Sequence, residues 1–538
     1  MGNCPVIFVP SHRSYADFIL ISYLCFTYDI EVPAIAAGMD FHGMWGMGNV
    51  LRHTGAFFMR RSYNNDALYW TTFKQYVYQL VSKGDLPVEF FVEGTRSRTN
   101  KSLTPKYGLI SMVLKPFFFC EVPDIKFVPI NISYDRILEE ALFAFELLGV
   151  PKPKESTSAF IKSLKIVKEN VGNIYFCFGR PISAKSFFGS KLDRSVHHNK
   201  GPLHTQDITI DEKSLIPSLA YDIIRTQQKC STITIFNLVS LILNDNLVRK
   251  KTPLSVKELI DEVKWMKEVI EKLGAFVFTE DMENSVEQCF IVHKNLIELQ
   301  PNGTICLVQN SVILDKFNPS QLKAHSLSEE CMTFSIPFVM LQMYINPTLY
   351  YFIDAALIVT VLKYHANLNE EGLFSTYHFL RSLFSMEFVT VPLWEKTDFV
   401  KALQYSASLN LVRCTPGNLY ELANNTKLQD CLYTMLEPFM TSYFVTVVVM
   451  ERCSGEIDEK SILVNVQKIL EDKINDGKQF IHPYCLNLDT LTNCLSVLVR
   501  LGALNKIRSQ KQSNLHGCML QCHIEDEVIV QSYTQSKL

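Results

Sequence analysis

The chain of 538 residues has almost no net charge, because 52 lysine and arginine residues nearly balance 55 aspartate and glutamate residues. Binding to nucleic acid through general electrostatic attraction needs a clear basic excess, so we exclude that function for the chain as a whole. Charged residues make up only 20% of the chain and apolar residues 47%. This composition excludes an intrinsically disordered protein and predicts roughly two to four domains with a large core.

Long apolar runs are also missing. The longest, residues 349–362, has only 14 residues and contains Asp354. Because a helix needs about 20 apolar residues to cross a bilayer, we predict a buried core helix here. No basic segment followed by a long apolar segment opens the chain, so no secretory signal is visible. The 15 cysteines show no paired spacing, which indicates reduced thiols in an intracellular compartment.

The first 182 residues alternate short apolar runs with segments of helical length. The apolar runs, which we expect to form buried strands, are residues 4–10, 32–38, 56–60, 87–93, 125–134 and 173–182. The helical segments between them include residues 14–28, 66–83 and 104–118. This alternation predicts an α/β domain over residues 1–182, with a mixed, largely parallel sheet flanked by helices. In such a sheet, functional side chains gather beyond the carboxyl ends of the strands.

The pattern changes after residue 182. Residues 183–211 are polar, and we interpret them as a linker or a long surface loop. Residues 212–535 are predicted to form a mainly helical region with some strand-like runs, such as 444–449. The two histidines and two cysteines within residues 516–523 do not follow the usual zinc spacings, so we expect no metal site there.

The first block of residues suited to catalysis follows the first predicted strand. His12 lies in the turn after that strand, and Asp17 lies in the first turn of the next helix. A carboxylate at this spacing can bind one imidazole nitrogen and leave the other as a proton acceptor, as a general base requires. Ser14 looks like the N-cap of this helix, so Ser14 and Asp17 also fit an ordinary capping box. This block alone leaves both interpretations open.

Two further predicted strands deliver arginines at their carboxyl ends. Arg60 ends the third apolar run, and Arg96 follows the fourth run together with Glu93 and Gly94. Glycine allows a close backbone approach, and guanidinium groups suit phosphate. Taken singly, such arginines are more typical of a solvated surface. Taken together, polar groups at three strand ends favour a shared site for an anion.

The fifth apolar run contains Pro129, which by itself indicates an edge strand or a bulge. In this order, the blocks resemble the signatures of the glycerolipid acyltransferase family: H-x4-D, G-x-x-F-x-R, F-x-E-G-x-R-S and a strand proline. The matching residues are His12, Asp17, Gly55, Phe58, Arg60, Phe91, Glu93, Gly94, Arg96, Ser97 and Pro129. The likeness extends over the chain, including the helical C-terminal region.

The resemblance implies transfer of a long-chain acyl group from acyl-CoA to the hydroxyl of dihydroxyacetone phosphate, the first step of ether-lipid (plasmalogen) synthesis. In that reaction His12 is the general base and Asp17 orients it. The residues implied to bind the substrate phosphate are Arg60, Glu93, Gly94, Thr95, Arg96 and Ser97, with Gly55, Phe58 and Pro129 supporting them. No cofactor or metal is implied, since acyl-CoA is a co-substrate.

Two alternatives to this reaction remain open. Glycerol 3-phosphate differs from the expected acceptor at one carbon, and the motifs do not separate the two acceptors. A different kind of alternative is a truncated, non-catalytic product that binds alkyl-dihydroxyacetone-phosphate synthase, the partner that follows in ether-lipid synthesis. Family members carry a long helical segment before the H-x4-D motif, whereas only 11 residues precede His12 here, so we expect the chain to be short at its N-terminus.

The last three residues, Ser536, Lys537 and Leu538, form a peroxisomal targeting tripeptide. We therefore expect import through the peroxisomal receptor and a location on the lumenal side of the peroxisomal membrane. Because the substrate carries an acyl chain, we also expect peripheral contact with that membrane. Residues 115–119 offer three phenylalanines for such a contact, although we favour ordinary core packing for them.

Overall fold

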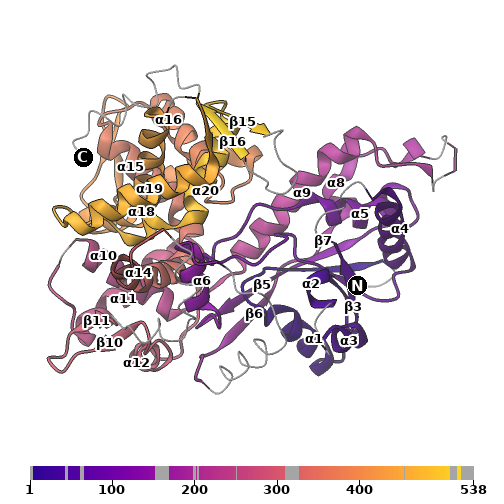
Figure 1. Ribbon diagram of the computed structural model, residues 1–538, viewed down its shortest axis with the longest axis horizontal. Coiled ribbons are helices and arrows are strands. Elements are labelled where there is room, and N and C mark those ends of the chain that lie inside the picture. The colour runs from indigo at the N-terminus through magenta and orange to yellow at the C-terminus, as the bar shows by residue number, and fades with distance from the viewer. Residues whose placement is uncertain are drawn as a thin grey trace.

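The computed structural model describes residues 4–42, 47–60, 66–151, 169–197, 201–202, 205–249, 251–308, 326–453, 455–508 and 518–522. An α/β part built on one sheet lies beside a mainly helical part (Figure 1). The strands of the main sheet are β1 (Val6–Pro10), β2 (Ala34–Gly38), β3 (Ala56–Met59), β4 (Val88–Glu89), β5 (Lys126–Tyr134), β6 (Ile174–Phe178) and β7 (Ile182–Ser183). Each of the six apolar runs contains a strand at the predicted place.

The sheet is largely parallel, as predicted. Its order is β3-β2-β4-β1-β5-β6, and β7 also pairs with β5. The first five strands in this order run parallel, while β6 and β7 run antiparallel to β5. The carboxyl ends of β1, β3, β4 and β5 therefore lie at one edge of the sheet, where His12, Arg60 and the 93–97 turn follow them.

Helices cover both faces of this sheet. The helices of the α/β part are α1 (Asp17–Thr27), α2 (Met39–His42), α3 (Met47–His53), α4 (Ala67–Lys83), α5 (Tyr107–Phe118), α6 (Glu140–Leu147), α8 (Ala184–Phe188) and α9 (Ile210–Lys229), with short 3₁₀ turns η2 (Gly189–Lys191) and η3 (Arg194–His197). Alternate residues of β1 point to opposite faces, as in any strand. Ile7 and Val9 pack with α4, α5 and α9, while Phe8 packs with Ile21 and Cys25 of α1.

The helical part shares one continuous core. Its helices are α10 (Ile235–Val248), α11 (Val256–Lys272), α12 (Met282–Val292), α14 (Glu329–Ile345), α15 (Leu349–Tyr364), α16 (Glu370–Leu383), α17 (Glu395–Ser408), α18 (Thr426–Glu451), α19 (Glu459–Asp476) and α20 (Leu488–Arg500), with 3₁₀ turns η6 (Asn346–Thr348), η7 (Pro392–Trp394) and η8 (Pro483–Leu486). Its small sheets are formed by β8 (Thr232–Ile233) and β9 (Phe276–Val277), by β10 (Ile297–Leu299) and β11 (Ile305–Leu307), by β12 (Val412–Cys414) and β13 (Tyr420–Leu422), and by β14 (Glu456–Asp458), β15 (Leu504–Arg508) and β16 (Cys518–Cys522).

Two stretches of the helical part are long and apolar enough to cross a membrane by length and composition. These are Glu329–Tyr364, which contains α14, η6 and α15, and Thr426–Glu451, which is α18. In the most apolar 18-residue segment of each stretch, 78% and 67% of the residues, respectively, are buried inside the protein. Both therefore pack as core helices do, as predicted for residues 349–362.

Three interpretations differ from the structure. Residues 444–449, read as a strand-like run, lie inside α18. The predicted domain boundary at residue 182 does not follow the packing of the helices. The helix α6, which lies before this boundary, contributes Ala144, Phe145 and Leu147 to the helical core, whereas α9, which lies after it, covers the sheet. Within the predicted linker at 183–211, α8 and η3 are ordered, and Phe188 is buried against the sheet core.

Pro129 lies in an interior strand rather than at an edge. β5 is flanked by β1 on one side and by β6 and β7 on the other. On that second side β7 pairs with residues 126–127 and β6 with residues 130–134, so Pro129 sits between the two ladders. Its missing N–H is not needed there, and its carbonyl oxygen accepts a hydrogen bond from the Gly179 amide at 2.8 Å.

Candidate active site

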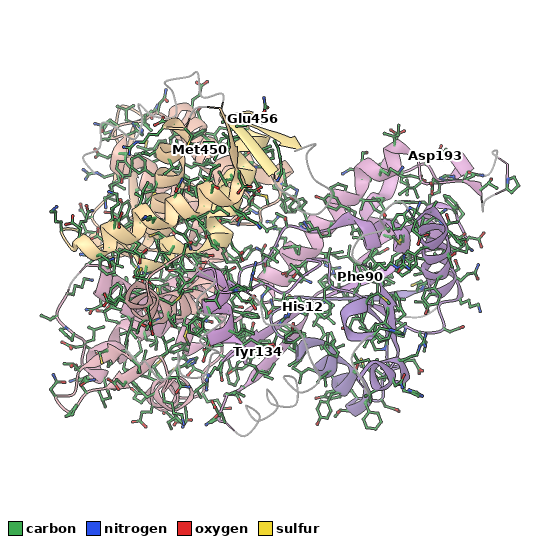
Figure 2. All side chains as sticks on the ribbon, in the orientation of Figure 1. His12, Phe90, Tyr134, Asp193, Met450 and Glu456 are labelled. Atoms are coloured by element: carbon green, nitrogen blue, oxygen red, sulfur yellow. The ribbon has the colours of Figure 1, made fainter. Side chains whose placement is uncertain are left out.

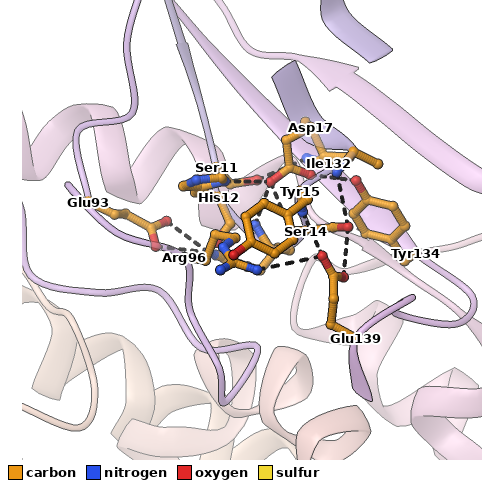
Figure 3. Close-up of polar contacts among 12 residues, drawn as sticks. Ser11, His12, Ser14, Tyr15, Asp17, Glu93, Arg96, Ile132, Tyr134 and Glu139 are labelled. Atoms are coloured by element: carbon orange, nitrogen blue, oxygen red, sulfur yellow. Dashed lines mark hydrogen bonds and ion pairs between the residues drawn. The ribbon is translucent and has the colours of Figure 1, made fainter. Parts of the chain in front are cut away.

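His12 and Asp17 are in direct contact at the carboxyl end of β1. The Nδ1 atom of His12 is 2.7 Å from Oδ2 of Asp17 (Figure 3). An ionised carboxylate can only accept, so Nδ1 carries the proton and Nε2 is left as the acceptor. This is the arrangement that a general base requires, and the sequence predicted its two members.

Asp17 is completely buried, and donors surround its carboxylate. Oδ2 also accepts hydrogen bonds from the backbone N–H groups of Arg13 at 2.7 Å and Ser14 at 2.9 Å. Oδ1 accepts a short hydrogen bond from the hydroxyl of Tyr134, which comes from β5. These donors stabilise the ionised carboxylate and fix its position.

Ser14 is not the N-cap of α1, contrary to the capping-box interpretation. The N-cap is Ala16; the hydroxyl of Ser14 donates to Glu139 at 2.8 Å and accepts from the backbone N–H of Ala16 at 3.2 Å. Only half of a capping box remains, in which the Asp17 carboxylate accepts from the Ser14 backbone. Asp17 therefore orders the turn that carries His12 as well as contacting the imidazole.

The imidazole of His12 is largely enclosed. Its ring stacks on Phe91 with a centroid separation of 3.9 Å, and its side chain is 16% exposed. Burial lowers the pKa of His12 below its ordinary value of 6.5. Hydrogen bonding to Asp17 opposes this shift, while the charges of Arg96 and Arg13 add to it. His12 is therefore neutral at pH 7, the form that accepts a proton.

The turn after β4 lies directly beside His12, because β4 neighbours β1 in the sheet. The backbone N–H of Ser97 donates to the carbonyl oxygen of His12 at 2.9 Å. Gly94 has a φ of +72°, which favours glycine, and a Cβ there would stand 2.9 Å from Cγ of Lys106. Thr95 is exposed on the same turn.

Glu93 does not face the expected phosphate pocket directly. Both of its carboxylate oxygens accept from Nη1 of Arg13 at 2.9 Å, and both side chains are buried. A carboxylate so engaged repels an anion rather than binding one. Glu93 instead ties the 93–97 turn to the turn that carries His12.

Arg96 is the cation placed beside the dyad (Figure 3). Its guanidinium carbon lies 3.3 Å from the centroid of the Tyr15 ring, and its Nη1 is 3.6 Å from Oε1 of Glu139. Glu139 also accepts from the Tyr15 backbone N–H at 2.8 Å. The Nη1 atom of Arg96 is buried without a hydrogen-bond partner among the described residues, so it can still donate to a ligand.

Arg60 is at the same edge of the sheet but far from this cluster. β3 and β1 are separated by two strands, which at about 4.8 Å per step is roughly 14 Å. The Arg60 side chain is 49% exposed and forms an ion pair with Asp66 at 2.9 Å. In the described part of the chain, no contact joins Arg60 to His12 or Arg96. The predicted shared site is therefore not formed by direct contacts among these three residues.

The two supporting residues of the β3 motif have local roles. Gly55 precedes β3 with a φ of +94°, and a Cβ there would be only 2.7 Å from the carbonyl oxygen of Pro33. The strand can therefore pair closely with β2 only if this residue is glycine. Phe58 is half-buried and packs edge-on against His42.

Sequence reasoning missed four residues of the site: Arg13, Tyr15, Tyr134 and Glu139. Arg13 and Tyr15 lie inside the H-x4-D block, but an intervening motif position carries no visible role. Tyr134 and Glu139 are more than 100 positions away, and only the pairing of β1 with β5 brings them near. Across the residues that the structure describes, no group of three or more His, Cys, Asp or Glu side chains is placed to hold a metal.

Two family models match the sequence, in agreement with the fold and with the placement of His12 beside Arg96. One described as "Acyltransferase" matches residues 3–133. The other, described as "Glycerol-3-phosphate acyltransferase C-terminal region", matches residues 143–507, which is more than half of the chain. The chain therefore belongs to the glycerolipid acyltransferase family, and it is an acyltransferase.

Several similar proteins of this family carry more specific names. Proteins named "Dihydroxyacetone phosphate acyltransferase" from Oryctolagus cuniculus and Homo sapiens are 34% and 33% identical over 508 and 506 residues. These alignments cover 93% of this chain and 72% of each relative. A protein named "Glycerol-3-phosphate acyltransferase" from Pseudomonas putida (strain GB-1) is 37% identical over 238 residues, which covers 44% of this chain and 28% of the relative.

Proposed function

We propose that the chain transfers a long-chain acyl group from acyl-CoA to the hydroxyl of dihydroxyacetone phosphate and forms 1-acyl-dihydroxyacetone phosphate for ether-lipid synthesis. The observation that carries this proposal is the buried His12–Asp17 pair with the Arg96 guanidinium beside it. A neutral base next to a cation suits a reaction in which a phosphate-bearing alcohol is deprotonated. The full-length relatives from rabbit and human carry the corresponding name.

In the proposed mechanism, the acceptor hydroxyl attacks the thioester carbonyl carbon while its proton moves to Nε2 of His12. Asp17 stabilises the imidazolium that forms, as the acid does in a catalytic triad. The new C–O bond replaces the C–S bond, and the departing thiolate takes the proton back from His12. No side chain becomes acylated, so no acyl-enzyme intermediate is required and no cofactor enters the scheme.

Arg96 is the proposed main ligand of the acceptor phosphate, because its charge acts on His12 and its Nη1, although 3.6 Å from Glu139, has no hydrogen-bond partner among the described residues. Thr95, exposed on the same turn, can add its hydroxyl as a donor, whereas the N–H of Gly94 is already bound to the Phe91 carbonyl oxygen at 3.0 Å. Arg60 would contact only the part of a ligand that lies farthest from His12, since β3 is three strand positions from β1 in the sheet. Glu93 and Ser97 act on the site by joining the turns through Arg13 and the His12 carbonyl.

An assay with the purified chain, palmitoyl-CoA and either acceptor tests the reaction through thiol release. We expect turnover with dihydroxyacetone phosphate and little with glycerol 3-phosphate. The second acceptor is a specific alternative because the family model of the helical part carries its name. A preference for glycerol 3-phosphate would establish that alternative. A folded chain without turnover would contradict both and favour a non-catalytic partner of alkyl-dihydroxyacetone-phosphate synthase.

We propose that the protein is imported into the peroxisome lumen through Ser536, Lys537 and Leu538, which lie outside the described residues. A fluorescent protein fused before Met1 leaves this end free for the import receptor. The fusion should collect in peroxisomes, and removal of Leu538 alone should leave it dispersed. Unchanged peroxisomal location after that removal would contradict the proposal.

For the peripheral membrane contact, we propose α1 rather than residues 115–119. Phe117, Phe118 and Phe119 are buried at 2% exposure or less, which confirms core packing for that segment. On α1, by contrast, Ile19, Tyr23 and Phe26 are exposed at helical spacing. The occupant of this face is proposed to be the lipid surface, because α1 begins at Asp17, next to the site that handles an acyl chain, and because aromatic residues favour the membrane interface.

A further inference from the structure

A cavity lies close to the turns that carry His12 and Arg96. It is a cleft of about 470 Å³ between the α/β part and the helical part, which is large enough for a small ligand. Its walls come from the end of β5, from α9, from the η6–α15 junction and from α17. Neither His12 nor Arg96 lines it, but Arg13 and Tyr134 do, so it adjoins the site described above.

Five cations line this cleft, and two of them, Arg13 and Lys101, are paired with buried glutamates. The other three lie on α9 and α17. Arg225 and Lys229 come from α9, and Lys401 comes from α17. The guanidinium of Arg225 stacks on Trp394 at 3.8 Å. Its Nη1 is buried and has no hydrogen-bond partner among the described residues, so this donor remains available. Partial burial lowers the pKa of Lys229, and the charges of Arg225 and Lys401 lower it further.

Carboxylates near this cluster offset part of its charge, since Asp222 and Asp398 raise the pKa of Lys229. Asp398 is 3.8 Å from Arg225 but accepts a closer hydrogen bond, at 2.7 Å, from Arg381. Asp354, also in the cleft wall, is bound by Arg381 at 2.9 Å. Asp222 lies near Arg225 and Lys229, and its own burial raises its pKa.

We propose that this cleft binds a phosphate-bearing ligand through Arg225, Lys229 and Lys401. The three cations meet at one wall and one buried donor lacks a partner, which costs free energy unless an anion or ordered water fills the place. Arginine and lysine together suit the several oxygens of a phosphate or diphosphate. The cleft also has hydroxyl and amide groups, such as Tyr350 and Gln228, that can complete the contacts.

The proposed anion site lies in a cleft that adjoins the His12–Asp17 pair. Tyr134 and Arg13 both line the cleft, and both donate hydrogen bonds to the Asp17 carboxylate. Two residues that hold the Asp17 carboxylate therefore form part of the wall of this cleft. Two sources fit the same chemistry: the nucleotide end of an acyl-CoA whose thioester reaches His12, or a separate phosphate compound.

Titration of the full-length chain with inorganic pyrophosphate tests the site, since binding requires no turnover and is independent of the proposed reaction. Calorimetry and tryptophan fluorescence both report on it, because Trp394 lies against Arg225 and is one of only four tryptophans. We expect saturable binding that is weakened about tenfold or more in the Lys229→Ala/Lys401→Ala variant. Lys213→Ala, on α9 but outside the cleft, is the matched control and should bind normally.

A competition experiment distinguishes the two sources. If palmitoyl-CoA displaces bound adenosine 3′,5′-bisphosphate, the cleft holds the nucleotide end of the acyl donor; if it does not, the ligand is a separate compound, and either result supports an anion site. Thermal unfolding checks that each variant is folded, and Lys401→Ala alone serves if the double variant is not. Absence of saturable binding, or equal affinity in the cleft variants and the wild type, would overturn the proposal.

Discussion

At the scale of single residues, Asp17 connects the catalytic base to the rest of the fold. Its carboxylate contacts the imidazole of His12, two backbone N–H groups and the hydroxyl of Tyr134. A negative charge held by several donors is stabilised without mobile water and needs little reorganisation when His12 gains a proton. Asp17, which orients His12, is thus itself held by backbone donors of the turn after β1 and by Tyr134 of β5.

We expect Asp17→Asn to lower kcat by about 10³–10⁴-fold while the protein stays folded. The amide keeps the shape of the side chain but not the charge that fixes the tautomer of His12 and stabilises its protonated form. Acyl transfer and thermal unfolding should be measured together. Asp281→Asn is the matched control, because Asp281 also accepts a backbone hydrogen bond at a helix start, at 3.1 Å from Asn284 N. Nearly normal turnover in Asp17→Asn would remove Asp17 from the mechanism.

The pH dependence of kcat/KM should report the surroundings of His12. Because burial lowers the pKa of His12, activity should fall on acidification only below pH 6.5. Arg96→Met removes a positive charge that disfavours protonation, so the acidic limb should move to higher pH. Asp17→Asn removes a charge that favours protonation, so its residual activity should show a limb at lower pH. Shifts in the opposite directions would contradict His12 as the titrating base.

The contact of His12 with Asp17 could be predicted from the sequence because the two residues are only five positions apart. Arg96 is singled out by its place after a predicted strand, not by its distance from His12. The role of Glu93 could not, because its partner Arg13 is 80 positions away and faces it only after β1 and β4 pair. Arg60 shows the converse problem. A motif places it at the carboxyl end of its strand, but the order of the strands decides its distance from His12.

At the scale of secondary structure elements, α1 combines two different faces. Its inner face carries Asp17, Ile21 and Cys25 against the sheet, whereas its outer face exposes Tyr23 at 62% and Phe26 at 80%. Large apolar side chains exposed at helical spacing are costly in water unless a partner covers them. This exposed outer face is the one that we propose for the contact with lipid.

Replacing Tyr23 and Phe26 by serine should weaken binding to phosphatidylcholine vesicles by about 100-fold or more, because two aromatic side chains contribute roughly 1.5 kcal/mol each or more. Flotation of vesicles with the full-length chain measures this. Leu68→Ser is the matched control: Leu68 is equally exposed, but it lies on α4, which covers the opposite face of the sheet. Equal flotation of the double variant and the wild type would exclude α1 as the lipid contact.

Element types were predictable where local pattern and burial agree. Each apolar run of the sheet is short and bounded by polar turns, and each contains a strand. Residues 444–449 are rich in valine, which favours strands, yet they lie within α18. There the helix packs on α15, α19 and α20, and this tertiary packing outweighs the intrinsic preference. Pro129 likewise could not be placed, because the break between β6 and β7 that accommodates it depends on β5 pairing with both.

At the scale of the whole molecule, the helical part holds the catalytic turns in place. His12 and Tyr134 lie where the two parts meet, and Met450 marks the helical side (Figure 2). Arg98 binds Asp489 at 2.7 Å, and Lys101 forms a close ion pair with Glu387. Both cations belong to the segment that follows Arg96, so the active site depends on residues nearly 300 or more positions away. Nothing in the local sequence indicates these contacts.

The pair of Lys101 and Glu387 is almost fully buried, so its two charges depend on each other. Glu387→Leu should destabilise the protein by about 3–5 kcal/mol, because it leaves the ammonium of Lys101 unpaired between aromatic rings. The double variant Lys101→Met/Glu387→Leu should recover most of this loss, since two apolar side chains replace two charges. Urea unfolding of the three proteins measures both effects. The exposed pair of Lys264 and Glu283 is the control, and Glu283→Gln should change stability little. If Glu387→Leu were as stable as the wild type, the helical part would not hold the catalytic turn through this pair.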